Sequence, residues 1–162
     1  MSSTGSNRHR KADAPRNGSI GLRRGDMPGH LSFLIDSDLD QGREVQKQIL
    51  AAVSEHGFSG QNYFAITLAI EEAITNAIKH GNRLDKKKKV RIEARISTKQ
   101  FEIEIEDEGV GFDRTKVPDP TSVENLEKCS GRGILLIEAY MNRVSWDHGG
   151  RRVRMLKLNE PE

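Results

Sequence analysis

The sequence has 162 residues, which is enough for one domain with its own core and a short tail. Charged residues make up 31% and aromatic residues 5%, so the core must be largely aliphatic. The 26 basic and 24 acidic residues nearly balance, whereas a nucleic-acid-binding domain concentrates basic charge on one face. This balance argues against direct nucleic-acid binding.

Two further features exclude other classes of protein. The single cysteine, Cys129, rules out an internal disulfide and offers no cysteine pair for a metal. No apolar run approaches the roughly 18 residues of a membrane helix, and the N-terminus lacks the apolar core of a secretory signal. We therefore expect a soluble, cytoplasmic protein that does not contact a membrane.

Residues 1–28 are rich in Ser, Gly, Asn, Arg and Pro and carry almost no apolar side chains, which predicts a flexible N-terminal tail. A single domain is then expected over residues 29–162. Apolar periodicity and capping residues predict its elements in this order: a strand at 30–37, a helix at 38–56, a helix at 61–80 capped by Ser59, strands at 90–96 and 101–106, a helix at 134–142, and strands at 144–146 and 153–158.

The strands at 90–96 and 101–106 alternate apolar residues with charged ones, which is the pattern of a sheet with one wet face. Opposed Arg and Glu side chains on that face are expected to pair across these two strands. Gly149 and Gly150 predict a hairpin turn between the last two strands. Runs of strands separated from runs of helices predict an α+β two-layer sandwich, with a mixed or antiparallel sheet and about three helices on one face.

Glu72 and Asn76 form the first of three patches that carry chemistry. They are four residues apart on the second predicted helix, so they lie on one helix face beside core-type residues. A carboxylate and an amide at the edge of an apolar stripe are costly to desolvate unless a ligand satisfies them. A hydrated Mg²⁺ with phosphates would do so. The plainer interpretation is an exposed pair that slightly supports the helix.

Asp107, Gly109 and Gly111 form the second patch, at the end of a predicted strand. The Asp107 carboxylate would accept a hydrogen bond from an exocyclic amine such as that of adenine. The two glycines let the backbone approach a flat ring or turn sharply. Alternatively, the strand simply ends in a turn.

Gly131, Arg132 and Gly133 form the third patch, a glycine-rich turn that runs into a predicted helix. Backbone amides at a helix N-terminus attract phosphate oxygens, and Arg132 would add a charge-assisted contact. The alternative is a flexible hinge. The spacing matches neither a Walker-type loop nor a Rossmann loop.

Taken in order, the three patches resemble the ATPase domain of the GHKL superfamily, which has the Bergerat ATP-binding fold. The segments Glu-Ala-Ile-Thr-Asn-Ala-Ile-Lys-His-Gly at 72–81 and Ser-Gly-Arg-Gly-Ile at 130–134 are most similar to the anti-sigma-factor serine/threonine kinases of bacterial partner-switching systems. The resemblance covers about residues 30–158, which is nearly the whole of the predicted domain.

The resemblance implies ATP and Mg²⁺ as ligands and assigns roles to residues. Asn76 would hold the Mg²⁺ bound to ATP, Glu72 would be the general base toward a protein hydroxyl, and Asp107 would bind the adenine amine. Residues from about 114 to 130 would form an ATP lid. Further nucleotide-binding positions would be Lys79, Gly109, Gly111, Gly131, Arg132 and Gly133.

The resemblance also implies a function. The protein would phosphorylate a Ser or Thr of an anti-anti-sigma (STAS-type) partner and alternately sequester a sigma factor, and a homodimer is a further expectation.

One departure from the family leaves a second hypothesis open. Many members carry a Thr in the last strand beneath the adenine, but residues 149–153 here include neither Thr nor Ser. Adenine binding would then be weaker or completed through water, and the second hypothesis is a nucleotide-gated binding module that transfers no phosphate. A third hypothesis is the catalytic half of a two-component histidine kinase. Against it, the chain has no room for dimerisation helices that carry a phosphoacceptor histidine.

Overall fold

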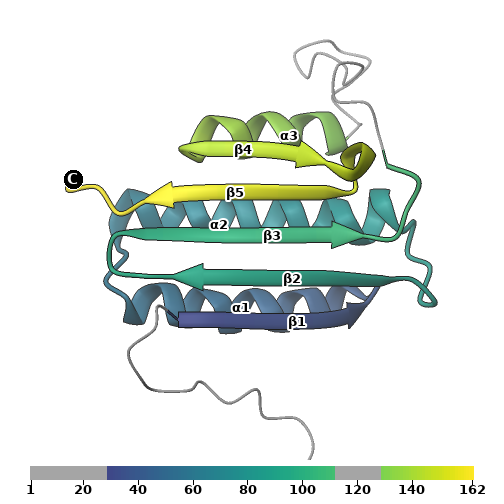
Figure 1. Cartoon of the computed structure of the whole chain (residues 1–162), viewed down its shortest axis with the longest axis horizontal. Coiled ribbons are helices and arrows are strands. Elements are labelled where there is room, and N and C mark those ends of the chain that lie inside the picture. Colours follow the sequence, from purple (N-terminus) through teal and green to yellow (C-terminus); the bar gives the residue numbers. More distant parts are fainter. Residues whose placement is uncertain (1–28, 112–128) are drawn as a thin grey trace, which may run out of the picture.

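The computed structural model describes residues 29–111 and 129–162. These residues form two layers, a five-stranded antiparallel sheet in the order β1-β2-β3-β5-β4 and a layer of helices on one face of it (Figure 1). The elements in chain order are β1 (Gly29–Asp36), α1 (Leu39–Glu55), α2 (Gly60–Thr75), a π-helix η1 (Asn76–Gly81), β2 (Lys89–Ile96), β3 (Gln100–Asp107), α3 (Cys129–Tyr140), β4 (Arg143–Asp147), a 3-10 turn η4 (His148–Gly150) and β5 (Arg152–Leu158).

This architecture confirms the predicted α+β two-layer sandwich and decides for the antiparallel sheet. In the described part of the chain, no helix is long and apolar enough to cross a membrane. The predicted tail at 1–28 and residues 114–128 of the predicted lid lie outside the described residues, so both stay predictions, as does the domain boundary at residue 29.

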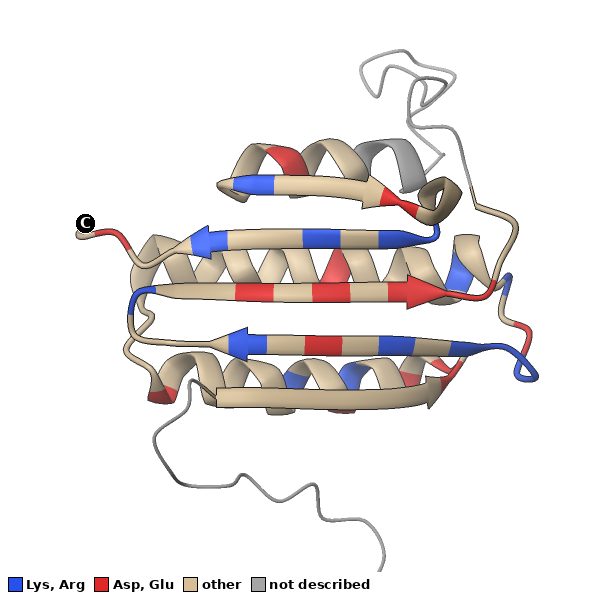
Figure 2. Cartoon of the chain, in the orientation of Figure 1, with Lys and Arg blue, Asp and Glu red and all other residues tan. Residues whose placement is uncertain are grey.

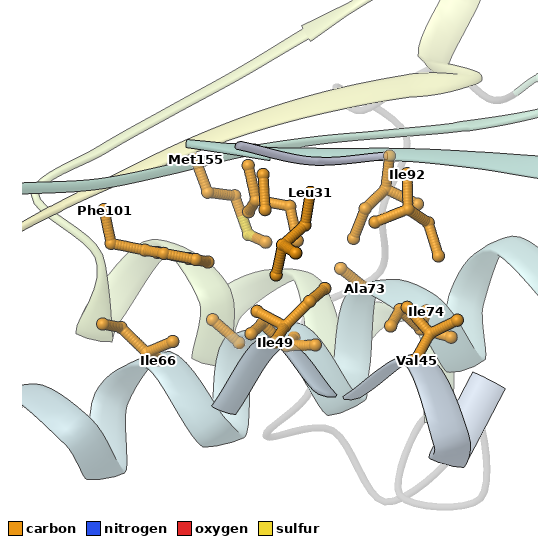
Figure 3. Packing of buried hydrophobic residues seen from close by; sticks show 14 of the residues in the cluster. Leu31, Val45, Ile49, Ile66, Ala73, Ile74, Ile92, Phe101 and Met155 are labelled. Atoms are coloured by element: carbon orange, nitrogen blue, oxygen red, sulfur yellow. The ribbon is translucent and has the colours of Figure 1, made fainter. Parts of the chain in front are cut away.

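Alternate residues of the strands point toward the helices and build a largely aliphatic core (Figure 3). Leu31 and Ile92 of the sheet belong to the same buried cluster as Ile49 of α1 and Ile66 of α2. Burial of one such side chain stabilises the fold by about 1.5–3 kcal/mol. The expectation of an aliphatic core, drawn from the low aromatic content, is therefore confirmed.

Among the described residues no helix covers the opposite face of the sheet, and charged residues recur along β2, β3 and β5 (Figure 2). The register places Arg91 opposite Glu106, but the ion pairs of β3 run to its other neighbour, β5. Arg152 Nε lies 2.6 Å from Glu106 Oε2, and Arg154 Nε lies 2.7 Å from Glu104 Oε2. The expected opposition of Arg and Glu across the strands now labelled β2 and β3 is therefore confirmed, whereas the described ion pairs of Glu104 and Glu106 join β3 to β5. The strand β3 has β5 on its second side, with two arginines directly opposite its glutamates.

Two helix starts show how side chains satisfy free backbone amides. Asp38 caps α1 as expected, since its carboxylate accepts hydrogen bonds from the backbone N–H groups of Asp40 and Gln41. Ser59 occupies the cap position of α2, as predicted, but its side chain makes no capping hydrogen bond. The Glu162 carboxylate accepts a hydrogen bond from the backbone of the second residue of α2 instead, an end-to-end contact that local sequence cannot reveal.

Candidate functional site

Glu72 and Asn76 lie at the C-terminal end of the long second helix, where its geometry changes. The helix predicted over 61–80 is α-helical only to Thr75, and Asn76 begins the π-helix η1. The backbone N–H of Asn82 bonds the carbonyl of Ala77, five residues earlier, at 2.9 Å. Single π-turns inside helices are frequent at functional sites, because they re-aim side chains.

The electrostatics of Glu72 suit a proton acceptor. The side chain is partly buried, and this burial raises the pKa of its carboxyl group, with a further contribution from the negative charge of Glu71. Among the described residues, no positive charge or hydrogen bond counteracts the rise. A carboxylate with a raised pKa holds a captured proton better than an exposed one does, which is what general base catalysis requires.

Gly133 of α3 packs directly against this pair. A Cβ atom at Gly133 would lie 2.5 Å from Glu72 Oε2 and 3.2 Å from Asn76 Nδ2. Only a glycine therefore lets α3 approach the two side chains so closely. The third predicted patch meets the first one through this residue.

Asn76 Nδ2 is buried and has no hydrogen-bond partner among the described residues. An unpaired buried amide is costly, so its presence at this position points to a ligand that would complete it. A half-turn of the amide exchanges its nitrogen and oxygen. The group therefore offers either a donor to a phosphate oxygen or an acceptor to a cation.

Asp107 stands at the end of β3 and packs against the end of η1. Only 8% of it is exposed, and its Oδ1 accepts a hydrogen bond from Gly109 N at 2.8 Å. Burial raises the pKa of the Asp107 carboxyl, although the bond from Gly109 and the charge of Arg151 act against the rise. A Cβ at Gly81 would overlap the carboxylate, and a Cβ at Gly109 would overlap the carbonyl of Gly81. These two glycines bring the first and second patches into contact.

Gly111 serves a different purpose in the same region. Its φ of +80° lies in the left-handed region that favours glycine, and a Cβ there would overlap the carbonyl oxygen of Gly149. Gly149 and Gly150 form the expected turn between β4 and β5. The segment that follows Asp107 is thus packed against that turn.

Three predicted site positions remain, and they are Lys79, Gly131 and Arg132. Lys79 is exposed and lines a hollow of about 250 Å³ between α1 and the second helix, together with Glu71, so its contact with phosphate stays a prediction. The third predicted helix begins at Cys129 rather than 134, so Gly131 and Arg132 lie within its first turn instead of before it. Their contact with phosphates stays a prediction.

Sequence reasoning missed Asn82 and Ser37 as part of this region. Asn82 was interpreted only as part of a helix end, and Ser37 only as the last residue of a strand. In the structure both are buried, and Asn82 Nδ2 donates to Ser37 Oγ at 2.8 Å. No local signal marks such a pair, because the two residues are 45 positions apart.

A family model described as a histidine kinase-like ATPase domain matches residues 35–157, from the end of β1 to β5. This chain belongs to the histidine kinase-like ATPase family. The resemblance that the three patches carry is thereby confirmed at the level of the family and its ATPase fold.

Two named relatives make the comparison more specific than the family model does. An anti-sigma F factor of Clostridium perfringens is 36% identical over 101 residues, which make up 58% of this chain and 71% of that protein. The serine-protein kinase RsbW of Listeria innocua is 31% identical over 117 residues, which make up 67% of this chain and 74% of that protein.

A solved structure supports the histidine kinase-like ATPase fold independently. The RsbU and RsbW domains of a Mycobacterium tuberculosis protein superpose with a TM-score of 0.56 at 20% identity, over 82% of this chain and 33% of that one. At this identity the likeness shows the fold alone.

Proposed function

We propose that this chain is an ATP-dependent serine/threonine protein kinase of the anti-sigma type. The observation that carries the proposal is the junction of Glu72, Asn76 and Gly133. There a carboxylate with a raised pKa lies beside a buried amide nitrogen that has no partner in the described part of the chain, and a glycine brings α3 against both. The names of the two relatives, an anti-sigma factor and a serine-protein kinase, agree with this chemistry.

The residues present fit Mg²⁺-bound ATP. Asn76 would hold the cation, Asp107 would accept a hydrogen bond from the adenine amine, and the amides at the start of α3 would face the phosphates. Within the described residues, no cluster of three or more His, Cys, Asp or Glu could hold a metal by itself. The cation would therefore arrive with the nucleotide. When bound, Mg²⁺-ATP supplies the phosphoryl group and a stabilised leaving group.

Glu72 is the residue proposed to act on the protein substrate. Its carboxylate would accept the proton of a Ser or Thr hydroxyl as that oxygen attacks, and it would later release the proton to solvent. Its position one helical turn before Asn76 places the base next to the proposed cation-binding residue. Lys79, Gly109, Gly111, Gly131, Arg132 and Gly133 are the further positions proposed to contact or shape the nucleotide site.

The partners follow from the same proposal. The phosphoacceptor would be a STAS-type anti-anti-sigma protein, and the chain would bind a sigma factor when that protein is phosphorylated. We further propose a cytoplasmic location, a homodimer as the working form and no direct contact with nucleic acid.

A nucleotide-gated binding module remains the second candidate. Residues 149–153 include no side-chain hydroxyl. This segment lies beside Asp107, because the backbone N–H of Asp107 donates a hydrogen bond to the Arg151 carbonyl oxygen at 3.0 Å. A pocket with a weaker adenine contact would bind and release nucleotide without efficient transfer.

A pull-down from native extract separates the two candidates. Tagged protein would be loaded once with Mg²⁺-ATP and once with Mg²⁺-ADP, and the partners and their phosphosites would be identified by mass spectrometry. A sigma factor in one state and a Ser- or Thr-phosphorylated STAS protein in the other would support the kinase. Partners that change with the nucleotide but never carry phosphate would support the binding module.

A further inference from the structure

Asn82 is a fully buried polar residue that the proposed chemistry does not use. Its exposed fraction is 0%, and it follows η1 directly. All three of its side-chain hydrogen bonds go to other segments. Nδ2 donates to Ser37 Oγ at 2.8 Å and to the Lys89 carbonyl at 2.9 Å, and Oδ1 accepts from the backbone N–H of Glu108 at 2.8 Å.

The partners of Asn82 lie at the ends of three strands. Ser37 follows β1, Lys89 opens β2 and Glu108 follows β3. Ser37 extends the network, since its hydroxyl donates to the Lys88 carbonyl at 2.7 Å. The Asn82 side chain therefore links the C-terminal end of η1, the π-helix that begins at Asn76, to the end of the sheet at which Asp107 lies.

The geometry makes Glu108 the decisive partner. Its backbone N–H belongs to the peptide unit that begins at Asp107, so the bond from Asn82 fixes the orientation of that peptide. The carbonyl of Gly81, the residue before Asn82, lies in close contact with Gly109, the residue after Glu108. The contacts of Asn82 and Gly81 thus hold together the two chain segments that the nucleotide would bridge, which are the end of η1 and the end of β3.

We propose that Asn82 is a positioning residue that fixes Asp107 relative to Asn76, and that it thereby sets nucleotide affinity without touching the nucleotide. The inference rests on the proposed nucleotide site. A buried amide that makes three hydrogen bonds in a low-dielectric interior holds its partners stiffly, because every alternative arrangement leaves a donor or an acceptor unpaired.

A second buried asparagine, near the opposite end of the helical segment that precedes Asn82, provides a matched control. Asn62 lies near the start of α2, about 20 Å from Asn76 along the helix axis at about 1.5 Å per residue. It is 7% exposed, and its Nδ2 donates to the Glu160 carbonyl at 2.7 Å. Its loss removes a buried amide from the fold without reaching Asp107.

The test compares Asn82→Ala, Asn82→Asp, Ser37→Ala and Asn62→Ala. Titration calorimetry with Mg²⁺ and a non-hydrolysable ATP analogue gives the affinity, and thermal unfolding without nucleotide gives the stability. Asn82→Ala is expected to weaken binding at least about tenfold, and Ser37→Ala about threefold. Asn82→Asp keeps the acceptor for Glu108 and is expected to recover part of the loss. Asn62→Ala should lower the unfolding midpoint but leave the affinity within about twofold of wild type.

The outcomes distinguish this inference from the function on which it rests. If the wild type binds the analogue and Asn82→Ala binds it as well as Asn62→Ala does, the positioning role is overturned and the proposed function stands. If the wild type binds no nucleotide, the proposed function fails and this inference fails with it. Should Asn82→Ala not fold, Ser37→Ala carries the test, and an unchanged affinity in that variant overturns the proposal.

Discussion

Gly133→Ala separates a role in the site from a role in stability. A Cβ at this position would lie 2.5 Å from Glu72 Oε2, so the carboxylate must retreat by about 0.9 Å to reach ordinary contact at 3.4 Å. The fold tolerates this shift because Glu72 Oε2 is the end of a flexible side chain. A misplacement of about 1 Å in a reacting group costs about 100-fold in rate, so phosphotransfer is expected to fall by about that factor.

The stability of the same variant should hardly change. Alanine in a helix interior is more stable than glycine by about 0.5–1 kcal/mol, and a displaced Glu72 rotamer costs a similar amount. The unfolding midpoint is therefore expected to stay within about 3 °C of wild type. The rate would be measured as transfer of labelled phosphate to the partner recovered from native extract, and the midpoint by circular dichroism.

Leu135→Ala is the control for Gly133→Ala. Leu135 lies two residues further along α3 and is 41% exposed, so its truncation alters the same helix without touching Glu72. This variant should keep the wild-type rate. A Gly133→Ala protein that transfers phosphate within about threefold of wild type would refute the argument that α3 must approach Glu72 this closely.

Two further predictions concern the adenine end of the site. Burial raises the pKa of the Asp107 carboxyl, so this group binds a proton more tightly in the folded protein than in the unfolded chain. The contribution of the Asp107 carboxyl to stability therefore falls as the pH rises through its folded-state pKa. Asp107→Asn removes this dependence. Its nucleotide-free unfolding midpoint at pH 7 should equal or exceed that of wild type, while calorimetry should show ATP affinity reduced by about 10- to 100-fold; wild-type affinity in this variant would exclude Asp107 as the adenine contact. Arg151→Thr supplies the hydroxyl that residues 149–153 lack, and one added hydrogen bond should tighten ATP binding by about 2- to 10-fold. An unchanged dissociation constant would show that the missing hydroxyl does not limit affinity.

The sequence was sufficient to predict features that depend on local spacing. Glu72 and Asn76 share a helix face because they are four residues apart, and the alternation at 90–96 and 101–106 gave the two central strands nearly to the residue. The order of the three patches was enough to identify the family. Each of these conclusions needed only periodicity and order along the chain.

Features that depend on distant neighbours were not predictable. The ion pairs of Glu104 and Glu106 run to β5, because the strand order places β5 beside β3, and nothing in a hairpin pattern reveals that neighbour. The contact between Gly133 and Glu72 joins residues that are far apart in sequence. The network of Asn82 likewise exists only once three strand ends meet, so a search for chemical motifs passes over it.

The central claim is that Glu72 accepts the proton when phosphate moves to a partner protein. The most direct measurement is the transfer of labelled γ-phosphate from ATP to the partner recovered from native extract, by wild type, Glu72→Gln and Glu71→Gln. Glu71 is the matched control, because it is an exposed neighbour that lines the hollow beside α1, and its loss removes only the smaller of the two causes that raise the pKa of Glu72. Our account predicts rapid labelling of a Ser or Thr by wild type and Glu71→Gln, with a loss of at least about 100-fold in Glu72→Gln at unchanged ATP affinity. Equal labelling by Glu72→Gln and wild type would contradict the assignment of the base, and no labelling by wild type despite ATP binding would contradict the kinase itself.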